Sequence, residues 1–257
     1  MKEFKLVKAN GAVIPCLSEV PERPKAVAIM IHGFTSNKNC ATAQLLFRRF
    51  PGRGIGVVTY DQPAHGNQEA REEQLRIKNC KESLECVEKY VSEHYPEAEI
   101  FYFASSFGAY VTGLYVSTRK HRGKKAFFRS AAVIMPELIL GPEGAEPDCQ
   151  VMAELDEKGY IEPDLGLGDR IKIPRGFLED LQENNLFEIF DNVKYGKTDV
   201  ELVHGGDDMV VPVRAAESFA EKFGFDITVM KGENHSICAE PASPDKVADL
   251  ALDFYLG

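Results

Sequence analysis

Short apolar runs recur along the chain and alternate with longer segments in which apolar residues return at a helical period. A run in which every position is apolar, such as Ala26–Ile31, predicts a strand that is buried on both faces of a sheet. The predicted strands are Ala26–Ile31, Ile55–Tyr60, Ile100–Ala104, Ala131–Met135, Val200–Val203 and Ile227–Met230. The predicted helices are Cys40–Phe50, Arg71–His94, Phe107–Thr118, Val213–Phe223 and a last helix capped by Ser243 with Pro244 at its first position.

Two further strands are predicted near the N-terminus. Phe4–Val7 and Ala12–Leu17 flank Asn10-Gly11, a dipeptide that strongly favours a tight hairpin. Pro15 lacks an amide hydrogen, so the second of these strands is expected at the edge of a sheet. The strands and helices that follow alternate, which is typical of a mostly parallel sheet of about eight strands with helices on both faces, the α/β class.

The alternation breaks between residues 136 and 195. Short helical patterns occur there only at Val151–Lys158 and Phe177–Phe190. The segment carries fifteen Asp or Glu and five Lys or Arg, a net charge of −10 that equals the charge of the whole chain. A long segment between two strands is typical of an insertion, and we expect 136–195 to form a cap over a pocket at the sheet edge. The basic residues within 119–125 predict a solvated surface loop.

Composition and charge narrow the classes of partner. The 257 residues include 40 acidic and 30 basic side chains, and a strongly acidic surface repels phosphate backbones and anionic lipids. Neither nucleic acid nor a membrane is therefore expected as a partner. The first residues alternate charged and apolar side chains, which predicts no signal peptide, and the six cysteines form no C-x-x-C pair. Reduced thiols and a cytoplasmic location are expected. No spacing of His, Cys or carboxylates fits a metal site, so neither a metal nor a cofactor is expected.

A sharp turn is predicted where the strand from Ile100 runs into Ser105-Ser106 and a helix follows. Strand, turn and helix are the context in which a serine is held with its hydroxyl exposed as a nucleophile. Such a turn needs small residues two positions before and after the serine, and Ala104 and Gly108 meet that need for Ser106. Ser105 would place phenylalanine at both positions. Ser106 is therefore the candidate nucleophile.

Other polar or turn residues also follow predicted strands. Phe34, His65, Ser106, Asp208 and His235 each come just after a strand, so we expect them to share one edge of the sheet. A serine hydroxyl needs a base, and the base needs a carboxylate that fixes its tautomer. His235 supplies the base, and Asp207 or Asp208 the acid. The His32-Gly33 turn allows the Phe34 amide to point into the pocket as an oxyanion donor.

These motifs resemble the α/β-hydrolase fold superfamily. The resemblance rests on His32-Gly33-Phe34, Ala104-x-Ser106-x-Gly108, His204-Gly-x-x-Asp208-x-x-Val211-Pro212 and the late His235. It covers nearly the whole chain outside the insertion and implies a single hydrolase domain over 1–257, with 136–195 as a cap after strand six. The first position of the serine motif departs from the pattern, since Ala104 replaces glycine.

The resemblance implies a role for each motif. Ser106 would attack an acyl carbonyl, His235 would transfer its proton, and Asp208, the fifth residue of its motif, would orient His235. The amides of Phe34 and Phe107 would form the oxyanion hole. Asp207 is the weaker candidate for the acid and fits a solvent-facing turn. Asp61-x-x-x-His65-Gly66 resembles a loop common in the superfamily, with Ala64 in place of glycine, and implies a structural or pocket-lining His65 that is not the base.

The expected substrate follows from a more diffuse likeness. The chain resembles small carboxylesterases of the cinnamoyl or feruloyl esterase kind, which implies hydrolysis of small or medium carboxylic esters, including aromatic acyl esters. The expected partner is thus a small-molecule ester. Phe34 and Phe107 are expected near the acyl group, whereas Tyr110 and Phe177 fit ordinary core packing better. The alternatives are a serine aminopeptidase that binds a free amine with cap carboxylates, a thioesterase, and a non-catalytic receptor that keeps the fold.

Overall fold

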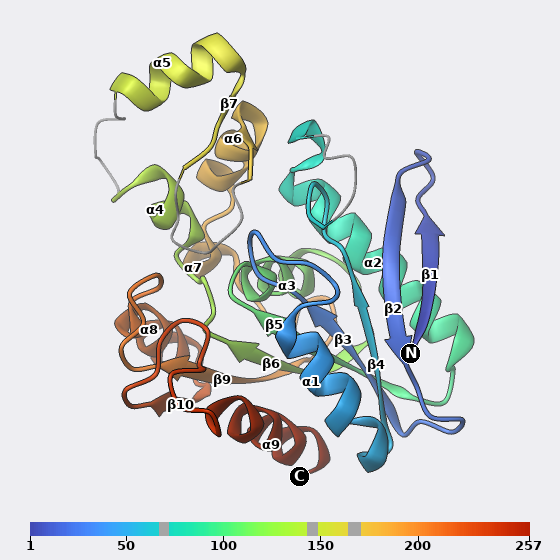
Figure 1. Ribbon diagram of the computed structural model, residues 1–257. Helices are drawn as coiled ribbons and strands as arrows, with labels where there is room; N and C mark the ends of the chain where they lie inside the picture. The colour runs from blue at the N-terminus through green and yellow to red at the C-terminus, as the bar shows by residue number, and fades with distance from the viewer. Residues whose placement is uncertain (67–71, 143–148, 164–170) are drawn as a thin grey trace.

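Eight strands form one sheet through the middle of the molecule in the computed structural model, which describes residues 1–66, 72–142, 149–163 and 171–257 (Figure 1). The strand order is β1-β2-β4-β3-β5-β6-β9-β10. Only β2 runs antiparallel to its neighbours, so the expected mostly parallel sheet is confirmed. The strands are β1 (Lys2–Val7), β2 (Val13–Glu19), β3 (Ala26–Ile31), β4 (Ile55–Tyr60), β5 (Glu99–Ser105), β6 (Gly123–Arg129), β9 (Asp199–Gly205) and β10 (Asp226–Met230).

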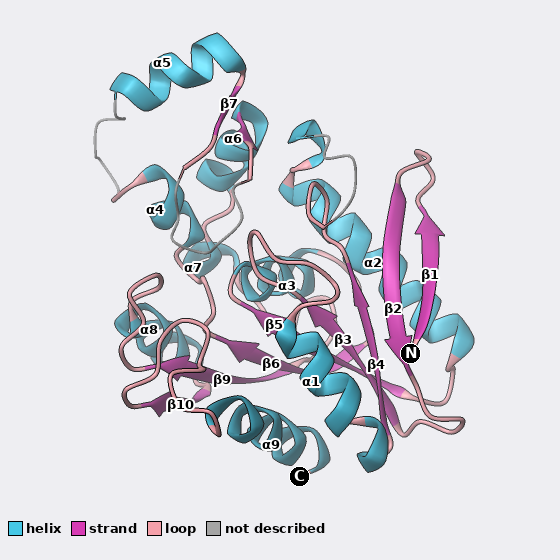
Figure 2. Ribbon diagram, viewed as in Figure 1, coloured by secondary structure: helices cyan, strands magenta, loops and turns pink. Residues whose placement is uncertain are grey.

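Helices cover both faces of this sheet (Figure 2). On one face α2 (Ile77–His94), α3 (Phe107–Thr118) and α8 (Val213–Phe223) bury their apolar sides in a single large core. On the other face α1 (Ala41–Arg49) and α9 (Ser243–Leu256) enclose a second core. The parallel strands β3 and β4 are buried at every position, as the continuous apolar sequence of β3 and the largely apolar sequence of β4 predict. None of the described helices is both long and apolar enough to cross a membrane.

The N-terminal hairpin forms as predicted, with Gly11 at a φ of 82° and Asn10 accepting from the Ala12 amide at 3.0 Å. The expectation of an edge position for β2 is wrong, because β2 lies between β1 and β4. Pro15 is tolerated there because the paired part of β4 stops at Tyr60, opposite Cys16. Beyond that point Pro15 contributes only its carbonyl, which accepts from the next amide, of Asp61, at 3.0 Å.

The sixth strand lies earlier in the sequence than its apolar pattern indicates. The predicted strand Ala131–Met135 is wrong, because β6 spans Gly123–Arg129. The predicted surface loop is confirmed over 119–122 and wrong over 123–125, which belong to β6. The two lysines of β6 hid this strand from the pattern. Lys125 carries its charge out of the sheet and donates from Nζ to the carbonyl of Phe254 at 2.6 Å, at the end of α9. The apolar residues after β6 are buried instead in the turns that lead into the next helix.

Two helix starts differ from the predicted ones. Helix α2 begins at Ile77, after a short 3₁₀ turn at Glu72–Gln74, and the predicted start at Arg71 lies outside the described residues. At the start of α9 the expected cap by Ser243 is wrong. The Ser243 hydroxyl instead donates to the carboxylate of Glu233 at 2.6 Å, in the loop that follows β10. This helix and that loop are therefore tied together.

The segment expected as an insertion lies between β6 and β9, and of it 143–148 and 164–170 fall outside the described residues. In Figure 1 its helices α5 and α6 stand above the sheet, at the top of the view. Its elements are α4 (Met135–Leu140), α5 (Cys149–Lys158), β7 (Tyr160–Ile161), β8 (Ile173–Pro174), α6 (Arg175–Glu183) and α7 (Leu186–Ile189). Asp180 of α6 fastens it to the start of α2, since its carboxylate accepts from the Ile77 amide and from the Arg76 guanidinium, each at 2.8 Å.

Candidate active site

Ser106 forms a strained turn between β5 and α3. Its backbone has φ 52° and ψ −116°, a conformation that a residue with a side chain rarely adopts. Hydrogen bonds hold the turn in place, because the Ser106 amide donates to the Arg129 carbonyl at 2.9 Å and the Ser106 carbonyl accepts from the Ala132 amide at 3.2 Å. The turn therefore presents the Ser106 side chain at the carboxyl end of the sheet.

Gly108 permits this turn to pack against the neighbouring strand β3. A methyl group on Gly108 would lie 2.3 Å from the carbonyl oxygen of Ile31 and 2.8 Å from that of His32. Both are backbone atoms that cannot rotate aside. The glycine requirement predicted two positions after the serine thus has a steric cause in the close approach of α3 to β3.

Substituting Gly108 with alanine is expected to destabilise the protein by about 3 kcal/mol, because the added methyl overlaps backbone atoms in a closely packed region. Gly52→Ala is the matched control, since a methyl group there meets nothing within 4 Å. Urea unfolding of both variants measures the difference. Equal midpoints for the two variants would show that β3 and α3 separate easily.

The structure brings together Ser106, His235 and Asp208, the three residues predicted to act in proton transfer and here called the relay. His235 Nε2 lies 2.9 Å from Ser106 Oγ, and His235 Nδ1 lies 2.7 Å from Asp208 Oδ2. The weaker acid candidate, Asp207, is exposed and does not take part. Ser106 is 8% exposed and lines a pocket that also contains His235. This arrangement places a hydroxyl, a base and a carboxylate in the order that nucleophilic catalysis needs.

Asp208 is held by more partners than the sequence motif indicated. Its Oδ1 accepts from the amides of Val210 at 2.8 Å and Val211 at 2.9 Å, and its Oδ2 lies 3.1 Å from Nε2 of the buried His204. Burial opposes ionisation of this carboxyl, but hydrogen bonds from His204 and His235 outweigh it and hold the pKa of Asp208 well below its ordinary value. Asp208 is therefore a carboxylate at neutral pH.

The backbone around His235 is positioned by residues that sequence reasoning missed. Ser130 Oγ donates to the His235 carbonyl at 2.7 Å, and the Arg129 guanidinium donates to the carbonyl of Ser236. Glu233 shapes the same loop by accepting from the amides of Ala239 at 2.9 Å and Glu240 at 3.1 Å. Of the residues that support Asp208 and His235, only His204 and Val211 had a signal in the sequence, because both belong to the motif that contains Asp208.

The turn after β3 lies against the serine. A methyl group on Gly33 would come within 3.3 Å of Ser106 Cβ, so the turn containing Phe34 approaches Ser106 closely. Within the described residues the amides of Phe34 and Phe107 donate to no other group. Neighbouring buried groups fix this turn: Asp61 accepts from the Lys38 amide at 2.7 Å and from Lys38 Nζ at 2.9 Å.

His32 and His65 pack behind this turn as neutral imidazoles. The Gln62 amide donates to His32 Nε2 at 3.1 Å, which requires that nitrogen to be unprotonated. The His65 ring contacts those of Phe34 and Phe107, with centroids 5.3 and 6.1 Å apart, and its Nδ1 donates to the Pro63 carbonyl at 2.8 Å. Burial lowers the pKa of His32 to about 4 and that of His65 to about 3. His65 makes no hydrogen bond to Ser106 in the described part of the chain.

This pair of histidines predicts a loss of stability in mild acid. Unfolded histidine titrates near pH 6.5, whereas folded His32 and His65 stay neutral down to about pH 4 and about pH 3. Below about pH 6.5 the unfolded chain therefore binds protons that the folded chain does not, and each group lowers the free energy of unfolding by about 1.4 kcal/mol per pH unit. Urea unfolding between pH 7 and 4 should show this slope, and His65→Gln should reduce it. An unchanged slope in His65→Gln would contradict the assignment.

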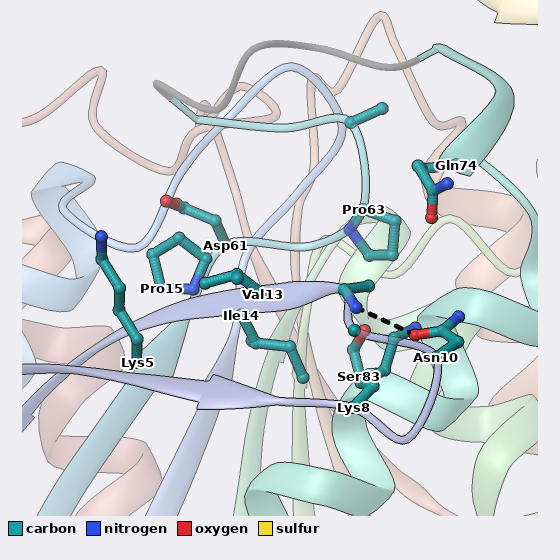
Figure 3. Close-up of a pocket in the computed structure, with 13 residues that line it drawn as sticks. Lys5, Lys8, Asn10, Val13, Ile14, Pro15, Asp61, Pro63, Gln74 and Ser83 are labelled. Atoms are coloured by element: carbon teal, nitrogen blue, oxygen red, sulfur yellow. Dashed lines mark hydrogen bonds between the residues drawn. The ribbon is translucent and has the colours of Figure 1, made fainter.

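Two pockets lie on different sides of the sheet's carboxyl edge. One, of about 700 Å³, is lined by Ser106, His235 and Phe34 and extends between α1 and α9. The other, of about 680 Å³, lies beside the N-terminal hairpin, where Lys5, Lys8 and Asp61 line it, and it contains no member of the relay (Figure 3). In the described ranges no three His, Cys, Asp or Glu side chains gather as a metal site would need.

Of the two aromatic side chains expected near the acyl group, Phe107 belongs to the core, as do Tyr110 and Phe177, for which core packing was expected. Phe107, Tyr110 and Phe177 have no exposed surface, and Phe34 is 4% exposed. Their rings pack on one another, as in the pair Phe107 and Phe177 with centroids 5.9 Å apart. The Tyr110 hydroxyl donates to the Asn184 carbonyl at 2.6 Å and so ties α3 to the inserted segment. Of the four, Phe34 also lines the pocket beside Ser106.

Solved structures with this fold come from distant sequences. A putative hydrolase from Agrobacterium vitis S4 is 19% identical with a TM-score of 0.79, and 98% of each chain is covered. Est1E from Butyrivibrio proteoclasticus, solved with ferulic acid bound, is 19% identical with a TM-score of 0.80, over 99% of this chain and 100% of that one. Mouse alpha/beta hydrolase domain-containing protein 10 is 14% identical with a TM-score of 0.73, over 100% of both chains.

Sequence comparison gives the family. None of the curated proteins matches this chain. Residues 22–161, more than half of the 257, match the family described as serine aminopeptidase, S33. The matched region includes the turn at His32-Gly33 and the strained turn at Ser106. The chain therefore belongs to the S33 serine aminopeptidase family of the α/β-hydrolase superfamily, a family of hydrolytic enzymes.

Proposed function

We propose that this protein hydrolyses small or medium carboxylic esters through an acyl-enzyme on Ser106. The observation that carries the proposal is the pair of short contacts, 2.9 Å from Ser106 Oγ to His235 Nε2 and 2.7 Å from His235 Nδ1 to Asp208 Oδ2. In this reaction Ser106 attacks the ester carbonyl while His235 takes its proton. His235 then gives that proton to the leaving alcohol, and water repeats the sequence to release the acid.

The oxyanion that forms during attack needs donors at fixed positions. In the proposal the Phe107 amide, at the start of α3, and the Phe34 amide, in the turn beside Ser106, donate to it. Neither amide donates to an acceptor among the described residues, and both belong to buried residues. One such donor typically contributes about 3 kcal/mol to lowering the barrier. In the same proposal the segment 136–195 acts as a cap that limits the access of water.

The preference for esters is supported by the structural neighbours. Est1E was solved with ferulic acid, and another similar structure is an esterase domain from Rhodothermus marinus, 19% identical with a TM-score of 0.70. In this proposal the acyl group is small or medium in size and includes aromatic acids. The open space beside Ser106, about 700 Å³, is large enough for such a group.

A second candidate is removal of an N-terminal amino acid from a peptide. It is favoured by the family description and by Glu137 of α4, whose Oε2 is buried without a hydrogen-bond partner among the described residues. Glu137 shares with Glu179 and Glu188 a pocket of about 680 Å³ within the inserted segment. A carboxylate placed there would pair with the free amine of a peptide substrate.

Reaction with a fluorophosphonate tests the shared mechanism. Intact mass measurement should show one adduct on the wild-type protein, none on Ser106→Ala and slow labelling of Asp208→Asn. Folded wild-type protein without an adduct would contradict an activated Ser106, and a non-catalytic receptor would then account better for the fold. Thermal unfolding of each variant controls for loss of structure.

Substrate panels then separate the two candidates. We expect cleavage of 4-nitrophenyl and methyl esters, and slow or no cleavage of aminoacyl naphthylamides. The reverse order of rates, together with a rise in KM for the naphthylamide in Glu137→Gln, would favour the aminopeptidase.

A further inference from the structure

The pocket beside Ser106 contains polar groups that ester hydrolysis does not use. It lies on the α1 and α9 face of the sheet and has a volume of about 700 Å³. Ser106, His235 and Gly33 line one end, and residues of α1 and α9 line the other. A ligand held in this pocket therefore lies close to the Ser106 hydroxyl.

Ser105 and Arg129 form a polar pair in the wall of this pocket. They are register partners on β5 and β6, so their side chains lie side by side on the same face of the sheet. Two residues earlier on the same strands, Phe103 and Phe127 belong to the apolar core beneath α1 and α9. The next pair on this face, Ser105 and Arg129, is therefore polar, although an apolar pair at the same place would extend the core.

Both members of the pair have unused hydrogen-bonding capacity. Ser105 is 4% exposed, and its Oγ is buried with no partner among the described residues. Arg129 donates to the Ser236 carbonyl and, in the ranges that the structure describes, pairs with no carboxylate. A guanidinium has five N–H donors in a planar fork, which suits a carboxylate. Most of those donors remain available.

The charge of the pocket is opposite to that of the protein. The chain carries −10, yet Arg129 and Arg48 line this pocket together with one carboxylate, Asp245. That carboxylate already pairs with the Arg49 guanidinium, which bridges α1 and α9. An anion entering the pocket therefore meets the Arg129 guanidinium, which no carboxylate of the described residues pairs with.

We propose that this pocket binds a carboxylate group of the substrate through Arg129 and Ser105, beside the ester that Ser106 attacks. The inference rests on the proposed ester hydrolysis and names its substrate class, esters that also carry a free carboxylate, such as half-esters of dicarboxylic acids. The carboxylate belongs to the acyl group or to the alcohol. A charge-assisted hydrogen bond of this kind changes binding by about 10- to 100-fold.

Two matched pairs of substrates test the proposal. For the acyl group the pair is mono-4-nitrophenyl adipate and 4-nitrophenyl hexanoate, and for the alcohol it is 4-acetoxybenzoate and phenyl acetate. We expect the wild-type protein to show a higher kcat/KM for the anionic member of one pair, by about tenfold or more, at low ionic strength. The pair that responds identifies the part of the substrate that carries the charge. A wild-type protein that prefers the neutral member of both pairs would overturn the proposal.

Variants of Arg129 separate substrate binding from support of the His235 loop. Arg129→Met should lower kcat/KM for the anionic ester by about 10- to 100-fold and change that for the neutral ester much less, whereas Arg129→Lys should restore part of the preference. Equal losses for both esters would mean that Arg129 only holds the loop through Ser236, which contradicts the proposal. Ser105→Ala should reduce the same preference by a few-fold.

A binding measurement tests the proposed carboxylate site independently of turnover. Calorimetric titration of Ser106→Ala with adipate should show binding that Arg129→Met weakens by about tenfold or more in the same background. Absence of binding would overturn the proposal even if the enzyme is active. If wild-type protein neither reacts with a fluorophosphonate nor cleaves any ester, the proposed function has failed, and the titration still tests the carboxylate site.

Discussion

Replacing Ser106 by alanine is expected to lower kcat for ester hydrolysis by about 10⁶-fold, the largest effect of any single substitution in this protein. The cause is the loss of the hydroxyl that lies 2.9 Å from His235 Nε2. The remaining catalysis comes from oxyanion donors and substrate binding alone. Steady-state hydrolysis of a 4-nitrophenyl ester measures the loss, with active-site titration to exclude traces of wild-type enzyme.

The double variant provides the control for this prediction. Because Ser106 and His235 act in one proton transfer, Ser106→Ala with His235→Ala should be no slower than Ser106→Ala alone. If the two losses multiply, His235 acts on something other than the Ser106 hydroxyl. Thermal unfolding of all three variants should give similar midpoints.

Asp208→Asn should lower kcat by about 10⁴-fold while the protein stays folded. Two backbone amides, of Val210 and Val211, donate to Oδ1 and will keep the amide oxygen of asparagine at that position. The NH₂ group then faces His235 Nδ1 and donates to it. His235 is forced into the tautomer with a proton on Nε2, which cannot accept from Ser106.

Asp207→Asn is the matched control, since it removes the same formal charge one residue away. Asp207 is exposed and its side chain touches no member of the relay, so activity should change less than twofold. A comparable loss in both variants would show that charge in this loop, rather than the hydrogen bond to His235, supports catalysis. The pH dependence of kcat distinguishes the two cases.

The fold was predictable wherever apolar pattern and burial coincide. β3 and β4 are buried at all positions, and their sequences alone predict their bounds. β6 was misplaced because a strand with two lysines does not look buried. Its Lys125 finds acceptors at the end of α9, 129 residues away, and this contact exists only in the folded chain. The residues around Lys125 in the sequence do not indicate this partner.

The candidate site was predictable in its proposed reacting groups and not in the residues that support them. Ser106, Asp208 and His235 stand in recognisable motifs at strand ends. The support of His235 by Ser130 joins residues 105 apart, and Ser130 belongs to no motif. His204 was visible as a motif letter, but its contact with Asp208 depends on the turn that follows β9. Supports of this kind follow from the tertiary fold, which brings distant loops together.

The backbone strain at Ser106 lowers the stability of the fold at the residue that the proposed reaction requires. A residue with a side chain held at φ 52° and ψ −116° costs about 1–3 kcal/mol, whereas glycine adopts this conformation freely. A domain is typically stable by only about 5–15 kcal/mol, so a residue with a side chain at this position lowers the stability by a sizeable fraction of the total. Selection for stability alone would replace Ser106 with glycine and erase the reacting group. Serine at this position therefore lowers stability relative to glycine, and the proposed reaction of Ser106 accounts for that cost.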